Sequence, residues 1–316
     1  MVSYIIRRLL IAIPVIIGVT IFNFIIINLA PGNPVEMFID PNTSADMIEL
    51  RKEQLGLNDP MWQQYLHWMG NLLQGNLGFS YTTNDPVVDV LLARIGPTFL
   101  LMGLALIVGL TIAIPLGILS AKKQYSFLDY TTMGVSFFGI SIPGFFLGLG
   151  LIYIFGLTLN WLPSGGMFTL GKEGDLLDRI KHLVLPVMVL SIYVAGTNIR
   201  YVRASMLEVF GQDYLRTARA KGLKEYVVTN KHAFRNALIP IITIIGIEVP
   251  ALLGGAVITE QIFQWPGMGQ LTIQSIMSRD YPTLMAINFM AAIMVLSANL
   301  ITDIVYSVAD PRIKYD

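Results

Sequence analysis

The sequence contains no cysteine and few charged residues, and both shortages narrow the functions open to it. Without cysteine there can be no disulfide, no thiolate metal ligand and no cysteine nucleophile. Only 13% of the 316 residues are charged, and 21 basic residues balance 21 acidic ones, which gives no electrostatic reason to expect nucleic acid as a partner. The histidines, His67, His182 and His232, lack metal-ligand spacing, and no GxxxxGK[ST] phosphate loop occurs. We therefore expect no metal, no cofactor and no catalytic centre in this chain.

Apolar residues, by contrast, make up 54% of the chain, and its mean hydropathy is +0.63. A helix that crosses a bilayer needs about 20 mostly apolar residues. Six stretches meet that requirement, at residues 9–29, 98–119, 133–157, 183–199, 238–258 and 284–306. Backbone polar groups cannot face lipid unpaired, so these stretches are predicted to be helices. The sequence thus predicts an all-α integral membrane protein with six transmembrane helices, and Ser141-Ile142-Pro143 predicts a kink in the third.

The distribution of basic residues predicts the orientation. If the amino terminus is cytoplasmic, 14 of the 21 lysines and arginines lie on the cytoplasmic side. This bias is typical of membrane proteins, whose cytoplasmic loops are enriched in basic residues. We therefore expect both termini in the cytoplasm.

The loop at residues 31–97, between the first two spans, contains eight acidic and three basic residues. Within it, Asn58-Asp59-Pro60 predicts the start of a helix that ends before Gly75. Tryptophan and other apolar residues form one broad face of this helix, which therefore either lies on the membrane surface or packs on the spanning helices. Asp85-Pro86 predicts a further short helix leading into the second span.

The longest cytoplasmic segment, residues 200–237, contains eight basic and three acidic residues. Residues 213–222 are predicted to form a short helix capped by Asp213 and ended near Gly222. Ala218 and Gly222 share one face, where small side chains would let a partner approach closely. The basic side chains around that contact are Arg216, Arg219 and Lys221. The segment is either a docking site for another protein or a basic loop that meets anionic lipid headgroups.

Two acidic residues fall within the predicted spans. Glu248 lies near the middle of the fifth span, where an ionised side chain is costly unless it faces water or a partner. It either lines a translocation path and meets a substrate ammonium group, pairs with a neighbouring subunit, or is buried in its protonated form. Asp303 lies near the cytoplasmic end of the sixth span, where a capping or interfacial role is expected.

The stretch after the fifth span, residues 260–269, combines Glu260, Phe263 and Trp265 with a Pro-Gly turn. It is either a gate or re-entrant element, or an aromatic anchor at the membrane surface.

Taken together, several segments resemble the transmembrane subunit of bacterial dipeptide/oligopeptide ABC importers, which have the type I importer fold. The resemblance rests on residues 4–8, 31–34, 75–80, 213–222, 235–240, 260–269, 279–282, 303–306 and 310–312. These segments occur in the expected order and cover nearly the whole chain. The resemblance implies division into a first helix with its outer loop (1–94), a five-helix transmembrane domain (95–306) and a cytoplasmic tail (307–316).

The resemblance also implies function and partners. It predicts a non-enzymatic permease subunit in the bacterial inner membrane, paired with a second homologous permease. Two cytoplasmic ATPases would drive peptide import by alternating access, and an extracytoplasmic binding protein would deliver the peptide. In this family the cytoplasmic loop carries the EAA motif, which docks into the ATPase. Here Arg216 and Thr217 replace its Glu and first Ala, whereas Ala218 and Gly222 match.

By the same resemblance, Asp213 and Arg219 belong to the coupling loop, and residues 260–269 face the binding protein or close the outer mouth. Two rival functions share these sequence features. One is import of nickel complexes, glutathione or another small solute by the same architecture. The other is an ion-coupled secondary transporter in which Glu248 and Asp303 hold the ion or proton.

Overall fold

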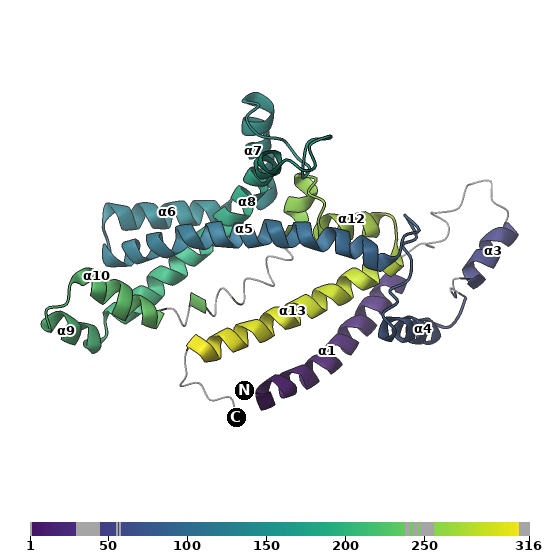
Figure 1. Ribbon diagram of the computed structural model, residues 1–316, viewed down its shortest axis with the longest axis horizontal. Coiled ribbons are helices and arrows are strands. Elements are labelled where there is room, and N and C mark those ends of the chain that lie inside the picture. The colour runs from purple at the N-terminus through teal and green to yellow at the C-terminus, as the bar shows by residue number, and fades with distance from the viewer. Residues whose placement is uncertain are drawn as a thin grey trace. The chain divides into compact units, whose positions relative to one another are not determined.

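The computed structural model describes residues 2–29, 45–54, 56, 58–237, 241–242, 246 and 256–309, whose regular secondary structure is helical (Figure 1). The chain forms two compact units. The first unit contains residues 1–97 and 267–296, and the second contains residues 98–266 and 297–316. Two long helices, α5 (Val87–Lys122) and α13 (Tyr281–Ala309), begin in the first unit and continue into the second.

The first unit contains α1 (Val2–Leu29), α3 (Ala45–Gln54), α4 (Met61–Leu73) and α12 (Met268–Met277), together with the beginnings of α5 and α13. Its hydrophobic core forms where α12 packs between those two beginnings. The buried core residues are Val87, Leu91, Met268, Leu271, Ala286 and Ile287. The helix predicted from the Asn-Asp-Pro sequence is α4: it starts directly after Pro60, and Gly75 beyond its end has a φ of 77°, which favours glycine.

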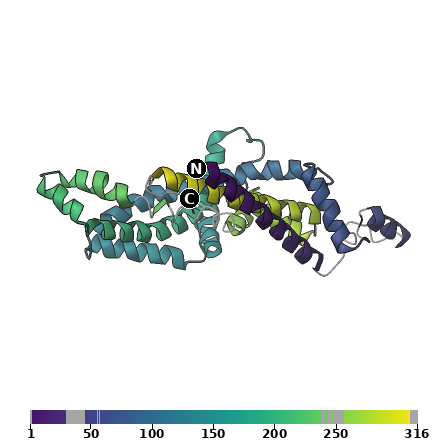
Figure 2. The same ribbon diagram turned by 90° about the horizontal axis from the view of Figure 1, so that it is seen from below.

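The second unit contains the rest of α5 with α6 (Phe127–Ser141), α7 (Gly144–Leu151), the π-helical segment η1 (Ile152–Thr158) and α8 (Leu176–Phe210). Beyond α8 come α9 (Asp213–Ala220), α10 (Glu225–Val227) and the π-helical segment η2 (Val228–Ala233). Figure 2 shows the green segment containing α9 and α10 at the far end of α8. Helix α6 packs along α8.

Glycines allow α5 and α8 to approach each other closely. A β-carbon added at Gly109 would lie 2.6 Å from Val194 Cγ1, and one added at Gly117 would lie 2.7 Å from Val202. Real β-carbons do not approach other atoms so closely, so the observed packing requires glycine at both positions. Small residues at helix contacts are the usual means of tight packing between membrane helices.

A buried ion pair fixes α6 to α8. The guanidinium of Arg203 donates to both carboxylate oxygens of Asp129, at 2.7 and 2.8 Å. Ser120 on α5 and the backbone N–H of Tyr125 also donate to this carboxylate. The Asp129 side chain is only 3% exposed, so the four donors replace the water that it loses on burial. The pair therefore joins the ends of three helices.

Four helices are long and apolar enough to cross a membrane, with stretches at Ile6–Leu29, Val87–Lys122, Leu176–Phe210 and Tyr281–Ile304. They include four of the six predicted spans. The third predicted span, 133–157, is instead a helix pair bent by 95° at Ile142 and Pro143, so up to five crossings are described. The predicted kink is confirmed, because proline disfavours helical backbone at the residue before it and Ile142 is extended. Most of the fifth predicted span, 238–258, lies outside the described residues.

One detail of the second span differs from expectation. Asp85-Pro86 does not start a separate short helix, because α5 runs unbroken for 36 residues from Val87. The helix continues through Gly96 and Pro97. The residues predicted to start a short helix and the predicted apolar span therefore belong to one helix.

Candidate functional site

Helix α9 in the basic loop has an inner face and an outer face. On the inner face, Leu215 is 0% exposed and Ala218 is 8% exposed, and both belong to the unit's own hydrophobic cluster. That cluster also contains Ala121 from the end of α5 and Val202 and Met206 from α8. The inner face therefore ties α9 to the ends of two long helices.

The outer face of α9 is polar and open to solvent. Asp213, Arg216, Thr217, Arg219 and Ala220 are all exposed. Arg216 lies 3.6 Å from Asp213 one turn away, and both side chains are more than three-quarters exposed, so this pair adds little stability. A partner that approaches α9 would meet this outer face, whereas Ala218 lies beneath it in the core.

The ends of α9 only partly follow the prediction. Asp213 is not the capping residue: Gln212 occupies that position, no side chain caps this fully described helix, and Asp213 is its first residue. An acidic residue in the first turn still interacts favourably with the helix dipole. The predicted stop is confirmed, since Gly222 has a φ of 75° and its N–H donates to the Arg219 carbonyl.

A second contact closes the turn after α9. The guanidinium of Arg219 donates two hydrogen bonds of 3.1 Å to the carboxylate of Glu225. This bond lowers the pKa of Glu225 from its ordinary value, and the positive charge of Arg219 acts in the same direction. The pair connects the end of α9 to the start of α10.

The stretch around Trp265 is buried in the second unit. Glu260 is 0% exposed, and its carboxylate accepts a hydrogen bond of 2.7 Å from Thr98. Phe263 is 2% exposed and Trp265 is 0% exposed. Trp265 packs with Leu101 on α5 and Leu183 and Leu190 on α8. In this structure the three side chains are part of the helix core, so the expectation of an aromatic anchor at the membrane surface is not met.

The loop before α8 is attached to the same stretch. Gly166 N–H donates a 2.7 Å hydrogen bond to the Phe263 carbonyl. His182 on α8 holds this loop from the other side, with Nδ1 3.0 Å from the Gly165 carbonyl oxygen and Nε2 3.5 Å from Asp178. The stretch at 260–265 is thus joined to α8 through backbone and side-chain hydrogen bonds.

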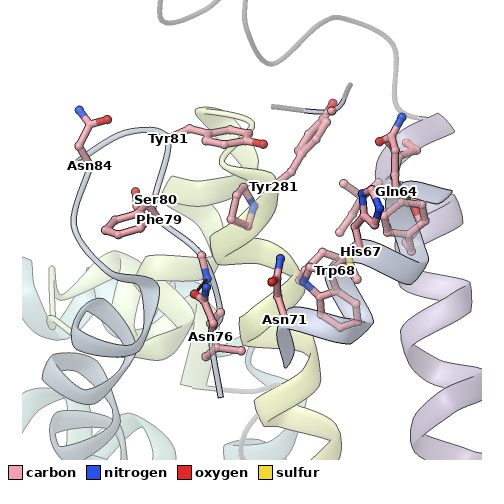
Figure 3. A pocket seen from close by; sticks show the side chains of 18 residues that line it. Gln64, His67, Trp68, Asn71, Asn76, Phe79, Ser80, Tyr81, Asn84 and Tyr281 are labelled. Carbon is pink, nitrogen blue, oxygen red and sulfur yellow. Dashed lines mark hydrogen bonds between the residues drawn. The ribbon is translucent and has the colours of Figure 1, made fainter. Parts of the chain in front are cut away.

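A pocket of about 660 Å³ lies in the first unit, between α1, α4, the loop after α4 and the start of α13 (Figure 3). Its polar and aromatic lining includes Gln64, His67, Trp68, Asn71, Tyr81 and Tyr281. Among the described residues that line it, none is Asp, Glu, Lys or Arg. Such a pocket can hold an uncharged polar group through amides and hydroxyls, and it offers no carboxylate, ammonium or guanidinium to a charged one.

Asp280 fixes one wall of this pocket. Its carboxylate accepts hydrogen bonds from Ser80 Oγ (2.5 Å), from Tyr81 N–H (3.0 Å) and from Thr283 Oγ1 (2.8 Å). Burial, together with the negative charge of Asp280, raises the pKa of Tyr81 to about 12, so its phenol is neutral at physiological pH. In the sequence, segments 75–80 and 279–282 contributed only to the family resemblance, and no contact between them was predicted. Their pairing is visible only once the chain is folded.

Of the two acidic residues in the predicted spans, only Asp303 is among the described residues. Glu248 lies outside the described residues. Asp303 lies in α13, where it is half-buried. Nor does any group of three or more His, Asp or Glu side chains suited to a metal ion occur among the residues that the structure describes.

Comparison with known families gives matches along nearly the whole chain. Residues 113–315 match the family described as binding-protein-dependent transport system inner membrane component, and residues 1–102 match the N-terminal region of such membrane components.

Curated relatives match over their full length. The oligopeptide transport system permease protein AppB of Bacillus subtilis (strain 168) is 48% identical over 100% of both chains. The dipeptide transport system permease protein DppB of Escherichia coli (strain K12) is 37% identical over 100% of this chain and 99% of its own. The di/tripeptide transport system permease protein DppB of Pseudomonas aeruginosa (strain UCBPP-PA14) is 40% identical with the same coverage.

A solved structure shares the fold. The chain matches the MetNI methionine ABC transporter, solved in inward-facing conformations, with a TM-score of 0.59 and 16% identity over 71% of this chain and 97% of that one. At this identity the likeness concerns the fold alone. The resemblance inferred from the sequence is confirmed, as is the prediction of a transport permease subunit rather than an enzyme. The chain belongs to the family of binding-protein-dependent transport system inner membrane components.

Proposed function

We propose that this chain is one of two homologous permease subunits in an ATP-driven importer that moves di- and oligopeptides across a bacterial inner membrane. Support for the peptide cargo comes from the relatives that match over their full length, which are oligopeptide, dipeptide or di/tripeptide permeases. An extracytoplasmic binding protein delivers the peptide, in keeping with the family description. Two cytoplasmic ATPases supply the energy.

The coupling role is supported by the structure of α9, which has one buried face and one exposed face. Its outer face offers Asp213, Arg216 and Thr217 to a partner, while Leu215 and Ala218 lie in one cluster with Val202 and other residues of the helix ends. Protein interiors are close-packed, so displacement of α9 has to displace what it packs against. A movement of the ATPase against the outer face would therefore reach α5 and α8.

The proposed orientation follows the basic residues. Both termini and the α9 segment lie in the cytoplasm, and residues 238–258 provide the remaining crossing of a six-helix topology. The proposed division comprises residues 1–94, 95–306 and 307–316. Glu248 would lie within the fifth crossing, where it lines the path, pairs with a neighbouring subunit or is buried in its protonated form.

Alternating access then involves the stretch at 260–265. Because Phe263 and Trp265 are packed on α8 and joined to its preceding loop, this stretch would shift as a block when α8 moves. We propose that the shift opens and closes the outer mouth beneath the binding protein. The chain itself makes and breaks no covalent bond.

The coupling role is tested with Arg216→Glu in the assembled transporter, reconstituted in proteoliposomes. A reversed charge on the outer face should lower both peptide uptake and the ATP hydrolysis stimulated by loaded binding protein, each at least roughly tenfold. Lys123→Glu, an equally exposed reversal in the turn between α5 and α6, should leave both rates near wild type. Equal rates in both variants and the wild type would exclude Arg216 from coupling.

The same vesicles separate the rival functions. Peptide import that requires ATP and survives collapse of ion gradients supports the importer, whereas uptake that follows the gradient without ATP indicates ion coupling. Competition by a nickel complex or by glutathione, in place of di- and tripeptides, would change the cargo but not the mechanism.

A further inference from the structure

Helix α4 presents three chemically different faces. Tyr65 points to α1, where its OH lies 3.0 Å from Thr20 Oγ1 and its ring meets Phe24 edge-on at 5.5 Å, and Trp68 packs beside Tyr65. Gln64, His67 and Asn71 form the polar wall of the pocket (Figure 3). The third face is apolar, and most of its side chains are exposed.

That third face is a regular stripe along the whole helix. It consists of Trp62, Leu66, Met69 and Leu73, spaced four, three and four residues apart, which places them on one side of an α-helix. Trp62 is 66% exposed, Leu66 56% and Leu73 81%, whereas Met69 is partly buried. Large apolar side chains gathered on one exposed face normally mark a surface that something covers.

The position of α4 on α1 indicates what covers it. The contacts at Thr20 and Phe24 lie within the apolar stretch Ile6–Leu29, not beyond its end. With a rise of 1.5 Å per residue, Phe24 lies about 7.5 Å and Thr20 about 13.5 Å along the axis from Leu29. An amphipathic helix at the membrane surface buries its apolar face about 5–10 Å into the boundary between headgroups and acyl chains. The Tyr65 ring meets Phe24 and only its hydroxyl reaches Thr20, so the side chain extends inward from a helix that lies near that boundary.

The composition of α4 agrees with this placement. Its thirteen residues include no Asp, Glu, Lys or Arg, so insertion carries no desolvation cost for an ionised side chain. Tryptophan, which stands first in the exposed stripe, is enriched at membrane–water interfaces. The absence of lysine and arginine also means that anionic lipid finds no permanently charged side chain on α4 to attract.

We propose that the stripe formed by Trp62, Leu66, Met69 and Leu73 lies in the lipid headgroup region at the Leu29 end of α1, making α4 an interfacial helix. This inference goes beyond the proposed transport function and does not depend on the cargo. Its consequence is that the pocket wall on the opposite side of α4 is fixed at the membrane surface.

The test uses the absence of cysteine from this chain. With any accessible cysteines of the partner subunits replaced, an introduced cysteine is the single labelling site. The assembled transporter with Leu66→Cys or Leu73→Cys is labelled with bimane and placed in phosphatidylcholine nanodiscs. His67→Cys is the matched control, because it adjoins Leu66 in sequence but faces the pocket. Quenching is measured with lipid carrying a nitroxide near the headgroup and, separately, with aqueous iodide.

We expect the lipid nitroxide to quench the labels at positions 66 and 73 at least roughly twofold more than the label at 67, and iodide to give the reverse order. Adding anionic phosphatidylglycerol should leave this pattern unchanged. Equal iodide quenching at 66 and 67 would overturn the proposal in favour of an aqueous surface. Protection of position 66 from both quenchers would overturn it in favour of a protein partner. Peptide uptake, measured on the same samples, reports separately on the proposed function.

Discussion

Ser80 and Asp280 are 200 positions apart in the chain, yet the hydroxyl of one donates to the carboxylate of the other at 2.5 Å. The same carboxylate accepts the N–H of Tyr81 and the hydroxyl of Thr283 at the start of α13. One acidic side chain thus holds the loop after α4 against the first turn of α13. Because Asp280 is only 2% exposed, water cannot replace these bonds.

Asp280→Asn is expected to loosen this loop. The new amide NH2 is a donor and would face another donor at a place where the carboxylate oxygen now accepts a hydrogen bond. A buried group left unsatisfied in this way costs about 1–3 kcal/mol. We expect a lower midpoint of thermal unfolding in detergent and faster proteolysis within residues 76–85. Asp85→Asn, an exposed change in the same loop, serves as the control. Equal proteolysis of the two variants would show that Asp280 does not restrain the loop.

Arg203→Met is expected to destabilise the second unit. Removing the guanidinium leaves the buried carboxylate of Asp129 without its charge partner, which typically costs about 3–5 kcal/mol. The thermal midpoint in detergent should fall sharply, while Arg235→Met, at an exposed position, should change it little. Combining Arg203→Met with Asp129→Asn should recover part of the loss. No recovery in the double variant would mean that Arg203 acts mainly through packing.

Two glycines on the same helix should respond in opposite ways to alanine. At Gly109 the new methyl would lie 2.6 Å from Val194, and such overpacking costs about 1–3 kcal/mol. At Gly103 a β-carbon meets nothing within 4 Å, so the higher helix propensity of alanine should stabilise α5 by about 0.5–1 kcal/mol. Thermal midpoints of the two variants, measured side by side, should move in opposite directions. A common direction would contradict the close approach of α5 and α8.

The Arg219–Glu225 pair predicts a pH dependence of the turn after α9. In the folded protein, the hydrogen bond from Arg219 lowers the pKa of Glu225 below its ordinary value of 4.5. The pair therefore stabilises the turn above pH 4.5, and this stabilisation is lost as the pH falls through the pKa of the folded state. Both side chains are 40% or more exposed, which limits the effect to a few tenths of a kcal/mol. Hydrogen exchange in residues 219–227 should show the loss of protection on acidification. Glu225→Gln should show less protection at neutral pH and a weaker pH dependence, and an unchanged wild-type profile in that variant would exclude the pair as the cause.

Local signals predicted the features that depend on neighbouring residues. Pro60 and Gly75 bracket α4 because proline suits a helix start and glycine takes the left-handed backbone at its end. Pro143 predicted the break in the third span for a similarly local reason, although the 95° bend is larger than a kink. Hydropathy predicted the long spans because few soluble helices have such a composition.

Features that depend on tertiary packing were not predicted. Spacing showed that Ala218 and Gly222 share a face, but only the cluster with Leu215 shows that Ala218 faces inward. Trp265 has the residue type of an interfacial anchor, yet side chains from α5 and α8 enclose it completely. The hydrogen bond between Ser80 and Asp280 has no signal in either segment alone, because neither segment contains both partners.

On α9, the residues that maintain the fold and the residues that a partner can contact lie on different faces. Leu215 and Ala218 are constrained by the helices beneath them, whereas Asp213, Arg216 and Thr217 touch nothing in the core. Related permeases can therefore diverge on the outer face while retaining the same inner packing. Under the coupling role proposed above, exchanging the few outer residues between two such permeases should redirect each to the other's ATPase.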